Sequence, residues 1–297
     1  MIPQETILVS LVNLIDRIPE PPEKKQRKRG HPNQYSNRLF LKALVIMIVR
    51  HLHTVNELLS VLAQQTAEME QLRLLLTENG HYPSRRTWEW RLKALPERLP
   101  AQIGCFGRYL MALIHPWAQR GRAGAIDSTV LRANGGVWHQ KDREKGAIPH
   151  SSIDNTEAHW TKFGWLGWVY GWKLHLISVA AAVWSPLAAD LTPAHVADQD
   201  PAPTLIRELP EELRYLLGDR HYHADMVETA CQLSNRILVT SDYGKYPHTD
   251  AGVEVRRVFH KLRSVAIENF NEHFKGIFDA HGQVPTKGLV TTCFATR

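Results

Sequence analysis

The stretch WVYGWKLHLISVA, residues 168–180, decides the fold class of the second half of the chain. Its centre is rich in β-branched and aromatic residues, a composition typical of a long strand. Shorter strands are expected before it at residues 125–131 (AIDSTVL) and after it at residues 186–191. Three strands that follow one another along the chain predict the first part of a sheet.

Beyond these strands the pattern changes to helices that alternate with strands. We expect helices at 197–208 and 224–234, strands at 215–218 and 237–240, and a last helix at 255–278. Consecutive strands followed by alternating helices and strands predict an α/β domain with a mixed sheet rather than a purely parallel one. Residues 138–167 are expected to form a long loop, and loops of that length are often functional.

The first part of the chain has helical periodicity instead. Helices are expected at 6–18, 37–53, 54–62, 66–77 and 101–117, and a basic arm at 24–37. Ser84 is placed as the N-cap of a further helix. That helix carries four cations: Arg85, Arg86, Arg91 and Lys93. Short helices that end in an arginine-rich one are typical of a helix-turn-helix DNA reader, although a bundle whose last helix is basic gives the same pattern.

The two parts of the chain differ in net charge. The chain has 297 residues and a net charge of +6, and residues 1–123 alone hold 18 Lys and Arg against 10 Asp and Glu, which gives +8. Residues 124–297 hold 18 against 20 and are slightly acidic, at −2. We therefore expect an all-α, DNA-binding region at 1–123 and a catalytic domain at 124–297, because a basic region beside an acidic one suits a polyanion partner. A solvated basic surface with no partner is the alternative.

Other classes of protein are excluded by composition. The three cysteines (Cys105, Cys231 and Cys293) form no C-x-x-C pair, so neither a disulfide framework nor a cysteine zinc site is indicated. The strongest apolar run, residues 43–49, is flanked by Lys42 and Arg50 and is far shorter than a membrane span. We expect a cytoplasmic, nucleoid-associated protein with no membrane partner.

Three carboxylates come from separate expected elements. Asp127 lies inside a strand of small apolar residues, Asp219 follows the strand YLLG, and Glu268 lies in the last helix. An acid in a buried strand is costly unless it is paired or binds metal, and the carboxyl end of a strand is where α/β sites gather. Carboxylates without histidine or cysteine at ligand spacing suit Mg²⁺. Taken singly, the three could also be a turn residue, a helix N-cap and half of an ion pair with Lys275.

These residues lie in motifs that together resemble the DDE transposases of bacterial insertion sequences, of the IS-four and IS-five type. The motifs are A-I-D-S-T around Asp127, G-D-x-x-Y from Gly218 to Tyr222, and I-E-N-F-N-E-H-F-K from Ile267 to Lys275. The family pattern also has an arginine four residues before the glutamate. Here Arg263 is five residues before Glu268, so the chain departs from the pattern at this point.

The resemblance implies an RNase H-like fold in which Asp127, Asp219 and Glu268 are catalytic and bind two Mg²⁺ ions, with Mn²⁺ as a substitute. It also implies that Lys275 and Lys173 contact DNA. The implied reaction is metal-dependent phosphodiester cleavage at the element ends, followed by joining of the 3′-hydroxyl to target DNA. The implied partners are double-stranded DNA, with terminal inverted repeats and a target, and a second copy of the chain in a synaptic homodimer.

Two other functions remain open. One is an RNase H-like nuclease that cuts DNA without joining it. The other is a truncated or inactive copy that acts as a DNA-binding protein, since the chain stops 22 residues after Lys275.

Overall fold

The computed structural model describes residues 6–19, 34–94, 105–106, 109, 123–180, 185–240, 257–259, 261–277 and 280–284. The chain divides into two compact units, Met1–Leu99 and Pro100–Arg297, which we describe separately. Sequence analysis had placed the boundary at residue 124. The expected arm at 24–37 and helix at 101–117 lie largely outside the described residues. No helix within the described ranges is both long and apolar enough to cross a membrane.

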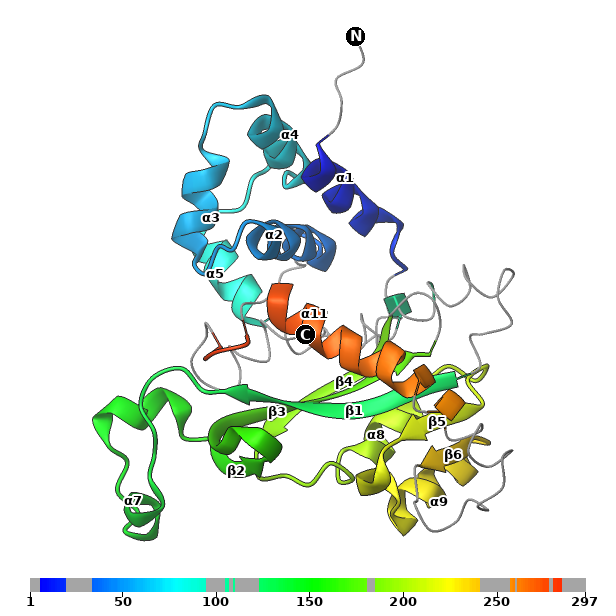
Figure 1. Ribbon diagram of the computed structural model, residues 1–297. Coiled ribbons are helices and arrows are strands. Elements are labelled where there is room, and N and C mark those ends of the chain that lie inside the picture. Colours follow the sequence, from blue (N-terminus) through cyan, green and yellow to red (C-terminus); the bar gives the residue numbers. More distant parts are fainter. Residues whose placement is uncertain are drawn as a thin grey trace. The chain divides into compact units, whose positions relative to one another are not determined.

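The first unit is helical, as expected (Figure 1). Its α-helices are α1 (Ile7–Leu14), α2 (Asn37–Val49), α3 (Val55–Leu62), α4 (Ala67–Leu75) and α5 (Arg85–Ala94), and a 3-10 turn, η1 (Ile15–Arg17), follows α1. A hydroxyl side chain caps the N-terminus of every one of these five α-helices by accepting a backbone N–H three residues on: Thr6, Ser36, Thr54, Thr66 and Ser84. These caps satisfy donors that the first turn leaves unpaired, so the sequence specifies where each helix begins.

The core of this unit explains the place of Arg91. Trp88 is fully buried and makes an edge contact with Phe40, with ring centroids 5.1 Å apart. The guanidinium of Arg91 lies over the Phe40 ring, 4.5 Å from the ring centre, and donates a hydrogen bond to Asn37 Oδ1 at 2.8 Å. The residue is only 9% exposed. The guanidinium of Arg91 thus helps to hold α5 against α2, and its contact with DNA stays a prediction.

The second unit is built on a mixed sheet. The described strands are β1 (Ala123–Arg132), β2 (His159–Phe163), β3 (Gly167–Val179), β4 (Pro186–Pro193), β5 (Tyr215–Gly218) and β6 (Ile237–Thr240). They follow the order β2-β3-β1-β5-β6, and β4 also pairs with β3. β3 is antiparallel to β1, β2 and β4, whereas β5 is parallel to β1 and β6 is parallel to β5. The expectation of a mixed sheet is confirmed.

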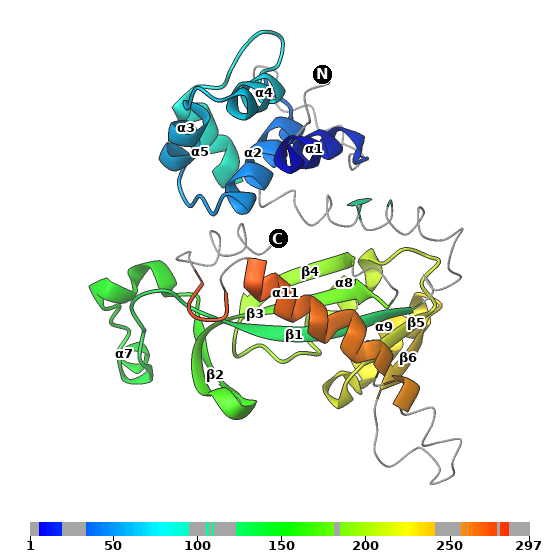
Figure 2. The same ribbon diagram turned by 45° about the horizontal axis from the view of Figure 1, so that its top comes forward.

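Helices cover both faces of the sheet (Figure 2). The α-helices α8 (Ala202–Glu208) and α9 (Asp225–Leu233) pack against one face, where Ile126 and Ile177 contribute to the core. The other face, which includes Trp172, is covered by a π-helical turn, η6 (Ser264–Glu268), and α11 (Asn269–Ile277). The remaining described elements are α7 (Gln140–Glu144) and the 3-10 turns η3 (His150–Asn155), η4 (Gly164–Leu166) and η5 (Arg220–Tyr222).

Two expected elements are corrected by the structure. Residues 138–167 are not one long loop, because they contain α7, η3, η4 and β2, and β2 pairs with the start of β3. Arg143 organises this segment by donating to Ala158 O at 2.5 Å and to Tyr170 Oη at 3.1 Å. The helix expected from residue 197 begins only at Ala202, after Pro201. A proline disfavours helical backbone in the residue before it, which explains the later start.

The buried histidine of β3 predicts how stability changes with pH. His175 is fully buried, its Nε2 is 2.9 Å from Thr192 Oγ1, and burial lowers its pKa to about 4. Between about pH 6.5 and pH 4 the unfolded chain binds a proton here that the folded chain does not. The free energy of unfolding should therefore fall as the pH is lowered through this window, by up to about 1.4 kcal/mol per pH unit from this residue.

Urea unfolding of the whole chain at pH 7 and pH 5 measures this effect. His175→Asn should lose less stability between these two pH values than the unmodified chain does. Equal losses in the two proteins would contradict the assignment.

Candidate active site

Two of the predicted acids lie at one edge of the sheet. Asp127 lies within β1, and Asp219 directly follows β5. The last paired residues of these parallel strands are Ala125 and Leu217, so each acid lies two residues beyond the same rung. Adjacent strands are about 4.8 Å apart, and their carboxyl ends meet at the same edge. The topology therefore brings Asp127 and Asp219 together, as the sequence predicted.

Asp219 also has a structural role. Its side chain caps η5 by accepting the backbone N–H of His221 at 2.8 Å, and its second oxygen is 3.1 Å from His221 Nδ1. Asp219 is thus the N-cap of a short helical turn, which is the other role expected for it from the sequence. An N-cap position fixes the direction of the carboxylate, so it does not compete with a functional role.

The surroundings of Asp127 raise the pKa of its carboxyl group. Burial raises the pKa of its carboxyl to about 7, while the charge of Arg263 and the N–H of Ser128 lower it and the charges of Asp219 and Asp198 raise it. The Ser128 N–H donates to Asp127 Oδ1 at 2.9 Å. The positive charge present in the chain is thus insufficient to keep this carboxyl at its usual pKa.

Arg263 connects Asp127 with the third predicted acid. One guanidinium nitrogen, Nη2, donates to Glu268 Oε1 at 2.7 Å, and Nη1 lies 3.7 Å from Asp127 Oδ2. The second oxygen of Glu268 accepts from Ser264 Oγ at 2.7 Å. Arg263 therefore lies between a partly buried carboxylate of the sheet and a more exposed carboxylate of the helix.

The spacing that departs from the family pattern has a structural explanation. Residues from Ser264 to Glu268 form a π-helical turn, in which backbone hydrogen bonds join residue i to residue i+5. Five residues in a π-turn cover about the same rotation as four in an α-helix, so Arg263 and Glu268 face the same side. The departure from the family spacing thus still allows the contact between arginine and glutamate.

A fourth acid, Asp198, was missed by sequence analysis. Its Oδ1 accepts from Ser128 Oγ at 2.7 Å and is 2.9 Å from Lys173 Nζ. Lys173 Nζ also donates to Val196 O at 2.8 Å, and Lys173 is only 8% exposed. The ammonium group of Lys173 is thus engaged inside the domain, and its contact with DNA stays a prediction. The one sequence feature that could have indicated Asp198 as a site residue is its position shortly after an expected strand and before Pro201.

Tyr222 of the G-D-x-x-Y motif lies beside the same acids. It is 1% exposed, and its pKa is raised well above the usual value by burial and by the charges of Asp127, Asp198 and Asp219. A phenol raised in this way stays protonated near neutral pH, so it adds no negative charge to the site.

The site does not contain a tight cluster of three acids. Within the described ranges, no group of three or more His, Cys, Asp or Glu side chains is close enough to hold a metal ion. Arg263 lies between Asp127 and Glu268, which accounts for the separation of these two acids. Lys275 lies farther along α11 and is partly exposed, and Glu272 in the same helix is exposed.

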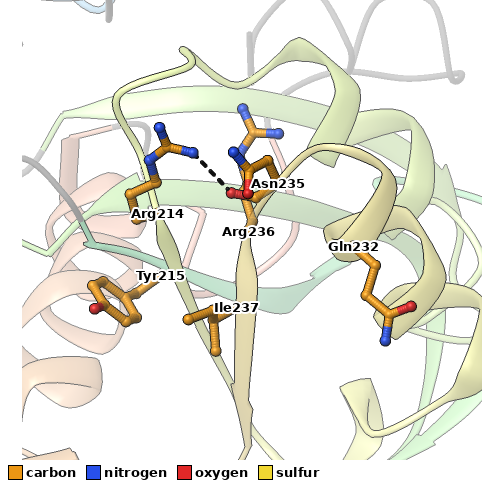
Figure 3. Close-up of a pocket in the computed structure, with 6 residues that line it drawn as sticks. All are labelled: Arg214, Tyr215, Gln232, Asn235, Arg236 and Ile237. Atoms are coloured by element: carbon orange, nitrogen blue, oxygen red, sulfur yellow. Dashed lines mark hydrogen bonds between the residues drawn. The ribbon is translucent and has the colours of Figure 1, made fainter.

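A separate pocket lies at the opposite end of β5 and β6 (Figure 3). Its volume is about 530 Å³, and Tyr215 and Ile237, which line it, are the first residues of these strands. Arg214 Nη1 donates to Asn235 O at 3.1 Å across this end. Because Asp219 follows the other end of β5, this pocket is not part of the acidic site.

The position of Arg263 predicts a change in the titration of Asp127. Arg263→Ala removes the charge that lowers the pKa of Asp127, so this pKa should rise above about 7. Arg263→Lys should give a smaller rise. Carboxyl NMR titration of the whole chain without divalent ions measures it, with the exposed Lys261→Ala as the control. An unchanged or lower pKa in Arg263→Ala would show that the two side chains do not interact.

Comparison with known proteins gives one family. Residues 118–238 match the family model described as transposase DDE domain. No curated protein matches the chain. This family match includes Asp127 and Asp219 and ends before Glu268.

One solved structure similar to the chain is a Mos1 transposase paired-end complex with the left transposon end. The sequence identity is 12% and the TM-score is 0.25, and the alignment covers 93% of this chain and 78% of the Mos1 chain. Another is a piggyBac transposase synaptic complex with hairpin DNA. The sequence identity is 10% and the TM-score is 0.27, and the alignment covers 81% of this chain and 48% of the piggyBac chain. The family match shows that residues 118–238 are similar to transposase DDE domains.

Proposed function

We propose that this chain is a DNA transposase of the IS-four or IS-five type, which cleaves the ends of an insertion sequence by metal-dependent phosphodiester hydrolysis and joins the freed 3′-hydroxyl to target DNA. One observation carries the proposal: Asp127 and Asp219 lie at the same edge of two adjacent parallel strands, within the stretch that matches transposase DDE domains. An RNase H-like fold for the second unit is part of the proposal, and the mixed sheet with helices on both faces supports it.

The donor set at this edge suits a divalent cation. Carboxylate oxygens are the preferred ligands of Mg²⁺ and Mn²⁺. Burial and the charges of Asp219 and Asp198 raise the pKa of Asp127 to about 7, and a bound cation would favour its charged form. Asp127 and Asp219 would hold the two proposed ions, and Glu268 would contribute once it is released from Arg263. When bound, such ions lower the pKa of water and neutralise charge on phosphate oxygens.

The chain's own side chains have distinct tasks in this proposal. Asp127 and Asp219 fix the position of the reaction on the rigid sheet. Arg263 holds Glu268 near that edge and supplies positive charge to Asp127. Lys275, one or two turns beyond Glu268 on α11, is proposed to contact a phosphate of the element end.

DNA binding is proposed for the first unit through α5. Arg86 and Lys93 are exposed on this helix, and Arg85, also exposed, pairs with Glu89 at 2.8 Å. These three exposed cations are candidates for phosphate contacts, whereas Arg91 is buried. Because two element ends must be brought together, the proposed assembly on DNA is a homodimer.

The experiment that tests the function uses DNA that contains the gene with its flanking sequence. The whole chain is incubated with this DNA, an unrelated target plasmid and Mg²⁺. Cleavage at inverted repeats and joined products would support the proposal. Cleavage without joined products from pre-cleaved ends would identify a nuclease, and DNA binding without either reaction would identify an inactive DNA-binding copy.

Substitution of the acids should separate chemistry from binding. Asp127→Ala, Asp219→Ala and Glu268→Ala should each abolish Mg²⁺-dependent cleavage while DNA affinity changes little, because the acids lie outside the proposed DNA-binding unit. Glu272→Ala is the matched control, since Glu272 is exposed on the same helix and contacts neither Arg263 nor Asp127 in the described structure. Full activity of Asp127→Ala would overturn the assignment.

Salt dependence should report the phosphate contacts of α5. The logarithm of the affinity for duplex DNA should fall with the logarithm of salt concentration, by about 0.9 for each phosphate contacted. Arg86→Ala should reduce this slope by about 1. Arg207→Ala, which removes an exposed arginine of the second unit, should leave the slope unchanged. Equal slopes for all three proteins would exclude Arg86 from the interface.

A further inference from the structure

The exposed face of α5 carries an unusual aromatic residue. Arg86, Trp90 and Lys93 are spaced i, i+4 and i+7, so they lie along one face of the helix. All three are exposed, and Trp90 is 65% exposed. The indole ring of Trp90 is therefore accessible to a partner. The opposite face, with Trp88 and Leu92, is buried in the core, so Trp90 is not needed to hold the helix in place.

A pocket of about 370 Å³ lies against this face. It is lined by two aromatic residues, two arginines and three other polar residues: Tyr35, Trp90, Arg86, Arg91, Gln34, Ser84 and Thr87. Arg91 is buried and hydrogen-bonded to Asn37, so Arg86 is the exposed arginine of the pocket. The pocket therefore combines flat apolar surface with hydrogen-bond donors and positive charge. Within the described ranges no acidic side chain lines it.

The acidic residue of α5 pairs with an arginine that does not line this pocket. Glu89 pairs with Arg85, at 2.8 Å. No ion pair of Arg86 is found among the described residues, and Arg86 is exposed. An anionic group that enters the pocket would thus meet Arg86 directly.

A nucleotide whose base is unpaired has the chemistry that this pocket selects. Its base offers a free π-face for stacking on an indole ring, its edge offers donors and acceptors, and its phosphate is anionic. In an intact duplex the faces of the bases are covered by their neighbours, so only base edges and phosphates are accessible. A hydrophobic protein segment would be a poor match, because cations flank the single exposed indole.

We propose that this pocket binds an unpaired nucleotide of the DNA on which the chain acts, with Trp90 stacked on the base, Arg86 on the phosphate and Gln34 at the base edge. The inference rests on the proposed function as far as the chain binds DNA. It adds that the first unit distinguishes DNA with unpaired bases, as found at an opened or cleaved end, from intact duplex.

The test compares two labelled duplexes of identical sequence, one blunt and one with a three-nucleotide 3′ overhang. Fluorescence anisotropy with the whole chain in EDTA gives their affinities without cleavage. The overhang should bind more tightly, and Trp90→Ala should lose about 5- to 100-fold in affinity for it while its affinity for the blunt duplex is kept. Trp90→Phe should retain part of the preference, because phenylalanine also stacks.

Trp168→Ala is the matched control, since Trp168 belongs to the second unit and is 68% exposed. It should leave both affinities unchanged. A wild-type chain that binds neither duplex would overturn the proposed DNA binding itself. A chain that binds both duplexes equally, or a Trp90→Ala variant that weakens both equally, would overturn only the inference about unpaired bases. If Trp90→Ala fails to fold, the same comparison with Trp90→Phe decides the question.

Discussion

The contact between Asp127 and Arg263 is the constraint on which the second unit depends. A carboxylate in the middle of a buried strand is costly in free energy unless a positive charge or hydrogen bonds compensate it. The Ser128 N–H supplies one hydrogen bond, and Arg263 supplies the charge from a helix far along the chain. The helical segment that carries Arg263 must therefore pack on this part of the sheet. Burial still raises the pKa of Asp127 to about 7, despite the charge of Arg263 and the Ser128 N–H, which lower it.

The π-helical turn reconciles this contact with the hydrophobic core. Ala266 and Ile267 are buried against the sheet, while Glu268 is exposed. An α-helical turn would place Arg263 about 140° away from Glu268, at 100° per residue over five residues. The wider turn keeps both residues on one side without moving the apolar face out of the core. π-turns within helices are frequent at functional sites, in agreement with the position of this one beside the acids.

Much of this arrangement could be predicted from the sequence, for physical reasons that also explain the failures. β-branched and aromatic runs identified β3 and its neighbours, and the position of Asp219 after a short apolar strand placed it at the edge with Asp127. The contact of Arg263 could not be predicted, because helical spacing assumes 3.6 residues per turn. The contact of Arg91 with the Phe40 ring could not be predicted either, because the two residues lie on different helices. The internal partner of Lys173, Asp198, lies in a turn without periodicity.

The account makes the edge formed by Asp127 and Asp219 a site for divalent cations, and binding of Mn²⁺ to the whole chain tests this most directly. Electron paramagnetic resonance of free Mn²⁺, with the protein in excess, measures the bound fraction in the absence of DNA. Binding should be lost in Asp127→Asn and in Asp219→Asn, should be retained in Glu272→Gln, and should be tighter in Arg263→Ala, where a competing positive charge is absent. Equal binding of Mn²⁺ by the unmodified chain and by Asp127→Asn and Asp219→Asn would contradict the account.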